Sequence, residues 1–165
     1  MVAWRQLGLK FSKNVFKSGK TPNSPEWYIF FHLALKPENM GQRILIAEDD
    51  PSIQKLFSII LKREGYEIEL TSDGKRVFEN QHELPNLFIL DRQLENSRDG
   101  LEACRYLKSK EATRDIPVIM ISATPEIGAL AKKAGAEDYL EKPFSIHVLL
   151  EKIKKFLKPG PTSDE

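Results

Sequence analysis

Cysteine and long apolar runs are both scarce in this chain. Cys104 is the single cysteine among 165 residues, which excludes an internal disulfide and fits a reducing compartment such as the cytoplasm. The longest apolar stretch, residues 29–35 with His32 inside it, is far shorter than the roughly 18 to 20 residues that span a bilayer. The first residues also lack the apolar core of a secretory signal. We therefore expect a cytoplasmic protein without a transmembrane helix.

A large excess of either charge is absent as well. The formal net charge is +1, which divides into +4 over residues 1–41 and −3 over the remainder. The basic segment has the composition to contact nucleic acid or anionic lipid, but a solvated tail is the commoner role of such a segment. We expect no direct binding of nucleic acid. Apolar residues at 41% and charged residues at 30% are typical of a soluble globular domain.

From Arg43 onward, short β-branched runs alternate with amphipathic helical patterns. The pattern predicts strands over residues 44–47, 66–70, 87–90, 117–121 and 139–140. It predicts helices over residues 51–64, 73–78, about 101–107, 127–134 and 146–157. This rhythm indicates an α/β fold with a doubly wound five-stranded parallel sheet, in the flavodoxin-like order 2-1-3-4-5.

The helical patterns also predict which faces are buried. Asp50 and Pro51 are suited to the start of the first helix, as its cap and its first residue, and Gly65 is suited to its end. The expected buried stripe of that helix is Ile53, Leu56, Phe57, Ile60 and Leu61. We assign residues 42–158 to the domain, residues 1–41 to an N-terminal extension of low order, and residues 159–165 to a polar tail.

Several chemically active side chains directly follow the predicted strands. Glu48 and Asp49 follow the first strand, Asp91 the third, Ser122 the fourth and Lys142 the fifth. In open α/β sheets, ligands bind outside the carboxyl ends of the strands, near the point where the winding reverses. The three carboxylates would converge there, and such a hard, oxygen-rich site suits Mg²⁺. A carboxylate beside such an ion, with an ammonium and a hydroxyl nearby, is suited to accept a phosphoryl group.

Five segments, in this order, resemble the response-regulator receiver family of two-component systems. They are residues 44–53 (ILIAEDDPSI), 87–91 (LFILD), 99–102 (DGLE), 116–123 (IPVIMISA) and 135–144 (GAEDYLEKPF). Each segment alone is a weak signal, but five in the right order are specific. The resemblance covers almost all of Arg43 to Leu157.

The resemblance implies a role for each candidate residue. Asp91 would be the phosphoacceptor, and Mg²⁺ would be held by Glu48, Asp49, Asp91 and the backbone carbonyl of Gln93. Lys142 would contact the phosphoryl group, and the peptide bond after it, to Pro143, would be cis. The two residues expected to respond to phosphorylation are Ser122, through its hydroxyl, and Tyr139, through its rotamer.

Other roles remain open for some of these residues. Asp50 is best explained as a helix cap, Cys104 as a small buried hydrophobe, and Tyr139 as a packing aromatic as readily as a switch. The loop over residues 95–100 lacks the proline usual in the family and is one residue longer. We therefore expect partner recognition near the site to differ from that of other family members.

The function expected from the resemblance is that of a single-domain response regulator. A histidine kinase or histidine phosphotransfer protein would donate the phosphoryl group, and the chain would catalyse its own phosphorylation and hydrolysis rather than act as a conventional enzyme. Few residues follow Leu157, so we expect the output to be contact with a downstream protein. Two alternatives are an interaction module that works without phosphorylation and a phosphatase of the haloacid-dehalogenase type. The latter requires an aspartate at the position of Gln93.

Overall fold

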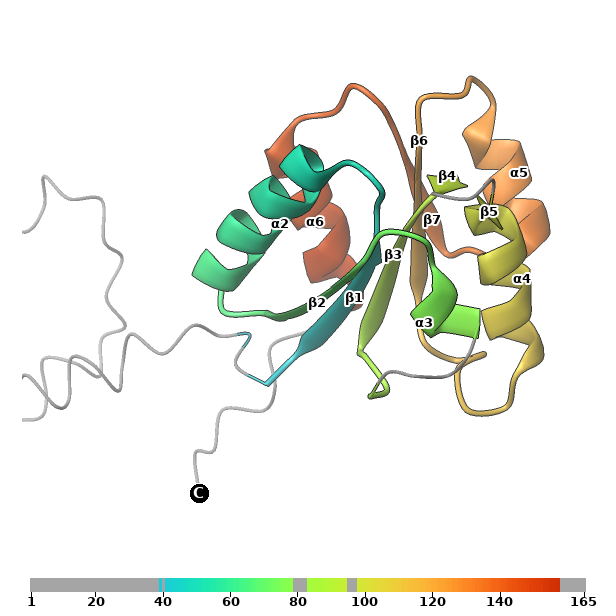
Figure 1. Ribbon diagram of the computed structural model, residues 1–165, viewed down its shortest axis with the longest axis horizontal. Helices are drawn as coiled ribbons and strands as arrows, with labels where there is room; N and C mark the ends of the chain where they lie inside the picture. The colour runs from blue at the N-terminus through green and yellow to red at the C-terminus, as the bar shows by residue number, and fades with distance from the viewer. Residues whose placement is uncertain (1–38, 40, 79–82, 95–97, 158–165) are drawn as a thin grey trace, which may run out of the picture. The chain divides into compact units, whose positions relative to one another are not determined.

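A parallel sheet of five strands forms the centre of the fold in the computed structural model, which describes residues 39, 41–78, 83–94 and 98–157. The strands are β1 (Arg43–Ala47), β2 (Glu67–Thr71), β3 (Leu87–Asp91), β6 (Val118–Ser122) and β7 (Asp138–Glu141). Their order across the sheet is β2-β1-β3-β6-β7 (Figure 1). All four neighbouring pairs are parallel. The predicted flavodoxin-like order is therefore confirmed.

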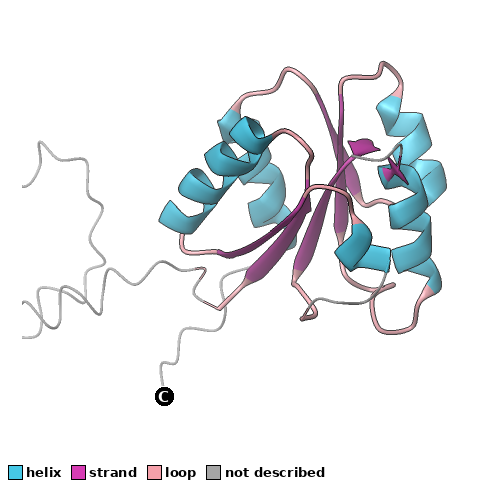
Figure 2. Ribbon diagram, viewed as in Figure 1, coloured by secondary structure: helices cyan, strands magenta, loops and turns pink. Residues whose placement is uncertain are grey.

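Helices cover both faces of this sheet (Figures 1 and 2). One face packs against α2 (Pro51–Arg63) and α6 (Ile146–Phe156). The other packs against α3 (Lys75–Phe78), α4 (Gly100–Ser109) and α5 (Ile127–Ala134). Because side chains alternate along a strand, Ile44 and Ile46 of β1 enter the first core while Leu45 and Ala47 enter the second.

The two central strands β3 and β6 are buried along their whole length. Each has helices on both faces, which explains why their sequences are continuous apolar runs rather than alternating ones. Each run ends in a polar residue, Asp91 in β3 and Ser122 in β6. The fold therefore places these two buried polar side chains at the carboxyl edge of the sheet.

Helix α2 begins as the sequence predicts but buries fewer of its apolar side chains. The Asp50 carboxylate accepts hydrogen bonds from the backbone N–H groups of Ser52 and Ile53, at 2.7 and 3.3 Å. Phe57 is 2% exposed, but Leu56 is 51% exposed, so its predicted burial is wrong. Adjacent helical residues point about 100° apart, and the sheet covers the side of Phe57.

A short antiparallel pair of strands, which the sequence pattern does not predict, follows Asp91. It consists of β4 (Gln93–Leu94) and β5 (Arg98–Asp99), with Gln93 opposite Asp99. Strands of two residues are too short to show a hydrophobic period, which explains why the pattern did not reveal them. The pair lies next to the phosphoacceptor candidate and leads directly into α4.

Most of the predicted N-terminal extension and all of the predicted tail over residues 159–165 lie outside the described residues. Within the extension, Asn39 is 7% exposed and donates a hydrogen bond from Nδ2 to the Glu64 carbonyl, at 2.9 Å. Among the described residues, no helix is long and apolar enough to cross a membrane. Cys104 is fully buried, and its burial raises the pKa of the thiol to about 11, as expected of a residue that packs in the core.

Candidate functional site

The carboxylates of Glu48, Asp49 and Asp91 meet at the carboxyl edge of the sheet. Glu48 and Asp49 directly follow β1 and Asp91 ends β3, and these strands are neighbours with Ala47 paired to Leu90. One oxygen from each of the three carboxylates lies within 4.8 Å of the others. The distance is short enough for a single cation to contact all three. The convergence expected from the strand ends is therefore present.

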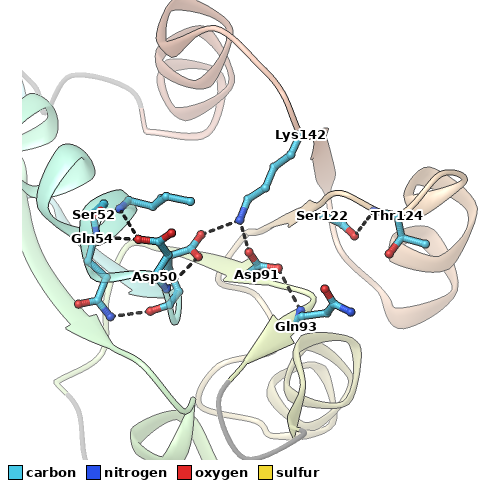
Figure 3. Close-up of polar contacts among 10 residues, drawn as sticks. Asp50, Ser52, Gln54, Asp91, Gln93, Ser122, Thr124 and Lys142 are labelled. Carbon is cyan, nitrogen blue, oxygen red and sulfur yellow. Dashed lines mark hydrogen bonds and ion pairs between the residues drawn. The ribbon is translucent and has the colours of Figure 1, made fainter.

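Lys142 reaches this cluster from the end of β7, the edge strand two positions from β3. It follows β7, and its backbone N–H donates a hydrogen bond to the Ser122 carbonyl at 2.8 Å. Its side chain extends across the strand ends, so that Nζ contacts Oδ2 of Asp91 and lies 3.0 Å from Oε2 of Glu48 (Figure 3). The peptide bond from Lys142 to Pro143 is cis, as the family resemblance implies.

Burial sets the electrostatics of the cluster. Glu48 is 1% exposed, and this burial raises its pKa to about 7, against the opposing effect of the hydrogen bond from Lys142. Burial by itself would lower the pKa of Lys142, but hydrogen bonds to Asp91 and Glu48 outweigh it and raise the pKa above its usual value. Lys142 therefore stays charged at neutral pH and provides one positive charge among three acidic groups.

The donor set of this cluster fits a hard divalent cation. Three carboxylate side chains supply oxygen ligands, and Mg²⁺ binds to proteins through a few carboxylates while it keeps several waters. When all three are ionised, one ammonium leaves a net charge of −2 in a largely buried place, which a divalent ion would neutralise. Glu48, Asp49 and Asp91 are therefore the residues that could hold such an ion.

Backbone contacts fix the position of Asp91. The N–H of Gln93 donates a hydrogen bond to Oδ1 of Asp91 at 3.0 Å (Figure 3). Gly100, at the start of α4, packs so closely on the Asp91 peptide that a Cβ at position 100 would lie 1.9 Å from the Asp91 carbonyl oxygen. The β4–β5 pair ends directly before this glycine. The phosphoacceptor candidate is thus held from both its side chain and its main chain.

Gln54 is a supporting residue that the sequence analysis missed. Its Nε2 donates a hydrogen bond to the Glu48 carbonyl at 2.5 Å (Figure 3), and the Asp50 N–H donates to Oε1 of Glu48 at 3.3 Å. Gln54 lies in the first turn of α2, directly after the acidic segment, and this proximity was the available signal. Both contacts orient the loop that carries the acidic pair.

Ser122 and Tyr139 do not join the carboxylate cluster. Ser122 is 1% exposed, and its hydroxyl accepts a hydrogen bond from the Thr124 N–H at 2.9 Å. Tyr139 is 43% exposed, on the edge strand β7. Within the described residues, neither side chain makes a polar contact with the three carboxylates. Ser122 ends β6, the strand next to β3, and Tyr139 lies on β7, one strand further from Asp91.

A comparison with models of protein families shows which family the chain belongs to. Residues 44–154 match the model of the response regulator receiver domain, which is well over half of the chain. The chain belongs to the response regulator receiver family. Phosphorylation on aspartate is typical of this family in two-component signalling.

Curated relatives of this receiver include transcriptional regulators. The DNA-binding dual master transcriptional regulator RpaA of Synechocystis is 38% identical over 119 residues, which cover 70% of this chain and 49% of that protein. The response regulator ArlR of Staphylococcus epidermidis is 36% identical over 124 residues, covering 73% and 55%. The receiver therefore spans about half the length of the curated relatives it matches.

Solved receiver structures resemble the fold closely. The receiver domain of the sensor histidine kinase PA1611 from Pseudomonas aeruginosa, with a magnesium ion coordinated in its active-site cleft, is 28% identical with a TM-score of 0.64. That match covers 71% of this chain and 98% of the other. The response regulator TrrA from Thermotoga maritima, in complex with Mg²⁺ and beryllofluoride, is 30% identical with a TM-score of 0.62, covering 70% and 99%.

Proposed function

We propose that this receiver accepts a phosphoryl group on Asp91 from the phosphohistidine of a histidine kinase or a histidine phosphotransfer protein. The observation that carries the proposal is the contact of one ammonium, Lys142 Nζ, with both Asp91 and the buried Glu48. A buried ionised carboxylate is unfavourable unless it is paired or used. Here a positioned cation lies beside the carboxylate that would receive the group.

Mg²⁺ is the cofactor proposed for this reaction. Glu48, Asp49, Asp91 and the backbone carbonyl of Gln93 would hold it, and the ion would neutralise the charge on the transferring oxygens. The magnesium-containing receivers from Pseudomonas and Thermotoga support this choice for a domain of the same family. Glu48 has a longer side chain than aspartate, and we infer that it reaches the ion through a water molecule.

The chain's own residues position the reactants. One carboxylate oxygen of Asp91 attacks phosphorus while the phosphorus–nitrogen bond of the phosphohistidine breaks, and the released imidazole takes up a proton. Lys142 Nζ, which contacts Oδ2 of Asp91, would remain beside the new acyl phosphate and balance its charge. Hydrolysis of the acyl phosphate by water returns the receiver to its starting state.

Ser122 and Tyr139 are proposed to convert phosphorylation into a change of surface. The Ser122 hydroxyl, now bonded by the Thr124 N–H, would turn towards a phosphoryl oxygen. Tyr139, which is 43% exposed on β7, would change its rotamer in response. The altered surface would then bind a downstream protein. Two further proposals rest on the sequence alone. They are that the receiver works without an output domain and that it is located in the cytoplasm.

Incubation with Mg²⁺ and a small phosphoryl donor, such as acetyl phosphate or phosphoramidate, tests the proposal. Mass spectrometry of the intact protein should show one added phosphoryl group, which Asp91→Asn abolishes. Asp50→Asn is the matched control, because asparagine also caps helices well and Asp50 caps α2. Full labelling of Asp91→Asn would contradict the assignment. An unlabelled wild-type chain would favour the alternative of an interaction module that works without phosphorylation.

A further inference from the structure

The ring of Tyr139 lies directly against Gly128 of α5. A Cβ at position 128 would lie 2.7 Å from Cζ of Tyr139 and 3.0 Å from its hydroxyl oxygen. Real Cβ atoms do not approach other atoms this closely, so the ring can occupy this place only because residue 128 has no side chain. Gly128 is the second residue of α5. The absence of a Cβ at this position leaves the space that the ring occupies.

A cation from α6 contacts the same ring. Nζ of Lys152 lies 5.7 Å from the centroid of the Tyr139 ring, within the range of a cation–π interaction. Asp138, the residue before Tyr139, accepts a hydrogen bond from Lys152 Nζ at 2.5 Å and pairs with Lys155 at 3.4 Å. The ammonium is therefore held over the ring by the strand that carries the tyrosine.

The helix that carries Gly128 is connected to the candidate site by a short segment. The Thr124 N–H bonds the Ser122 hydroxyl at 2.9 Å, and α5 begins three residues later, at Ile127. Between them Glu126 has a φ of 67°, in the left-handed region that is unfavourable for a residue with a side chain. A movement of Ser122 would thus act on a short and strained connection that ends next to Gly128.

We propose that Gly128 and Lys152 form a seat that holds the Tyr139 ring in its exposed position, and that this seat sets how strongly the receiver resists phosphorylation at Asp91. The inference rests on the proposed function, since it concerns the regulation of that same site. Gly128 and Lys152 act here as positioning residues, because each contacts Tyr139 and neither belongs to the carboxylate cluster of Glu48, Asp49 and Asp91. If the seat is filled or weakened, the ring leaves it and the phosphorylated state becomes easier to reach.

Fluorine NMR of protein labelled with 3-fluorotyrosine tests the seat. The chain has four tyrosines, and Tyr139→Phe identifies the signal of Tyr139. In the unliganded wild type, a soluble gadolinium chelate should broaden that signal strongly. Gly128→Ala places a methyl group where the ring lies, so the signal should shift towards its position in wild type with Mg²⁺ and beryllofluoride, and the chelate should broaden it less. Lys152→Met should shift the signal in the same direction by a smaller amount.

Titration with beryllofluoride in the presence of Mg²⁺ tests the coupling to the site. Gly128→Ala should lower the apparent Kd about tenfold, which corresponds to ~1.4 kcal/mol. Lys152→Met should lower it about two- to fourfold, because it removes the cation–π contact with the ring together with the Asp138 ion pair that holds the ammonium there. Lys154→Met is the control on the same helix, because Lys154 pairs with Glu64 at 3.1 Å, and it should leave both measurements unchanged. In a Tyr139→Ala background, Gly128→Ala should also have no effect on the Kd.

The outcomes separate the seat from the proposed function. An unshifted Tyr139 signal in Gly128→Ala would overturn the seat, and a Kd within twofold of wild type would overturn its coupling to Asp91. A wild-type protein that binds no beryllofluoride would overturn the proposed function and the coupling together. Even then, the fluorine signal of the unliganded variants would still test whether Gly128 and Lys152 hold the Tyr139 ring.

Discussion

Lys142 and Glu48 are 94 residues apart in the sequence, yet Nζ of the lysine lies 3.0 Å from Oε2 of the glutamate. The glutamate carboxylate is almost fully buried, and the lysine is the cation that contacts both it and Asp91. The contact therefore joins the first and last strands of the domain across the edge where β3 ends. The same ammonium thus pairs with a buried carboxylate and, in the proposed reaction, would contact the phosphoryl group.

Loss of that ammonium should destabilise the metal-free protein. Lys142→Met keeps most of the side-chain length but leaves two buried carboxylates without their cation, so we expect the free energy of unfolding to fall by about 2–3 kcal/mol at pH 7, within the range for lost hydrogen bonds to charged groups. Urea unfolding without Mg²⁺ measures this loss, and added Mg²⁺ should recover a large part of it. Lys154→Met, which removes a more exposed ion pair, should cost less than about 0.5 kcal/mol. Equal losses in the two variants would contradict the prediction.

Mg²⁺ itself should stabilise the fold through the acidic cluster. A ligand that binds only the native state adds about 2.7 kcal/mol when its concentration is 100 times its Kd, so the melting temperature should rise with Mg²⁺ concentration. Asp49→Asn should remove most of this rise, because Asp49 supplies one of the three converging oxygens. Asp50→Asn, a change of the same chemistry one residue later, should leave it intact. Thermal unfolding at several Mg²⁺ concentrations provides the comparison.

The neighbouring aspartates also show how far the sequence alone could be interpreted. Asp49 and Asp50 have similar local context, but the helix-capping pattern assigned Asp50 to α2, and the strand end assigned Asp49 to the site. The parallel order of the strands followed from the alternating pattern, and with it the convergence of Glu48 and Asp91. Such inferences succeed because strand ends and caps are local signals with few alternatives.

Contacts that depend on packing between distant segments could not be predicted from the sequence. The exposure of Leu56 depends on how much of α2 the sheet covers, which a periodic pattern does not specify. The close approach of Gly128 to Tyr139 depends on where α5 lies on the sheet edge. The β4–β5 pair arises from two strands of two residues, and no hydrophobic period exists at that length.

The pH dependence of stability should reveal the ion pairs of Asp138. Burial would raise the pKa of Asp138, but hydrogen bonds from Lys152 and the Tyr139 N–H, with the charges of Lys152 and Lys155, lower it below its usual value. A carboxylate with a lowered pKa contributes stability above its unfolded pKa of about 3.9 and loses it as the pH falls through the folded value. Asp138→Asn should therefore cost about 1 kcal/mol at pH 7.

The difference between wild type and Asp138→Asn should shrink as the pH falls from about 3.9 through the lower pKa of the folded state, because Asp138 becomes neutral in the native protein only below that value. Urea unfolding at pH 7, 5 and 3 measures it. A difference that stays constant across this range would show that Asp138 stabilises the protein through packing rather than through its charge.

Removal of the buried hydroxyl of Tyr66 should not lower the stability of the protein. Tyr66 is 3% exposed, its burial raises its pKa to about 12, and its hydroxyl has no hydrogen-bond partner within the described part of the chain. A buried, unpaired polar group costs about 1–3 kcal/mol. Tyr66→Phe should therefore leave the free energy of unfolding unchanged or raise it by about 1 kcal/mol.

Thr113 supplies the opposite case for comparison with Tyr66. Its buried hydroxyl donates a hydrogen bond to the Leu107 carbonyl at 2.7 Å, so Thr113→Val should destabilise the protein by about 1 kcal/mol or more. Chemical unfolding of both variants in one buffer makes the comparison direct. A clear loss of stability in Tyr66→Phe would show that the phenol has a partner that matters.

Gly100→Ala should damage the fold and the site together. The added Cβ would lie 1.9 Å from the Asp91 carbonyl oxygen and 2.9 Å from its carbonyl carbon, and main-chain atoms cannot rotate away as a flexible side chain does. Forced overpacking of this kind costs about 1–3 kcal/mol, and relief requires the Asp91 peptide to move. We therefore expect both a loss of stability and a loss of phosphorylation by acetyl phosphate.

Gly41→Ala separates this steric effect from the general cost of replacing a glycine. Gly41 has a φ of 84° and open space where a Cβ would lie, so alanine there meets only the backbone penalty of about 1 kcal/mol and should leave phosphorylation unchanged. If Gly100→Ala retained normal phosphorylation, the Asp91 peptide would tolerate displacement without loss of chemistry. In that case the close packing of α4 on β3 would serve the fold alone, and positioning of Asp91 would depend on its side-chain contacts with Gln93 and Lys142.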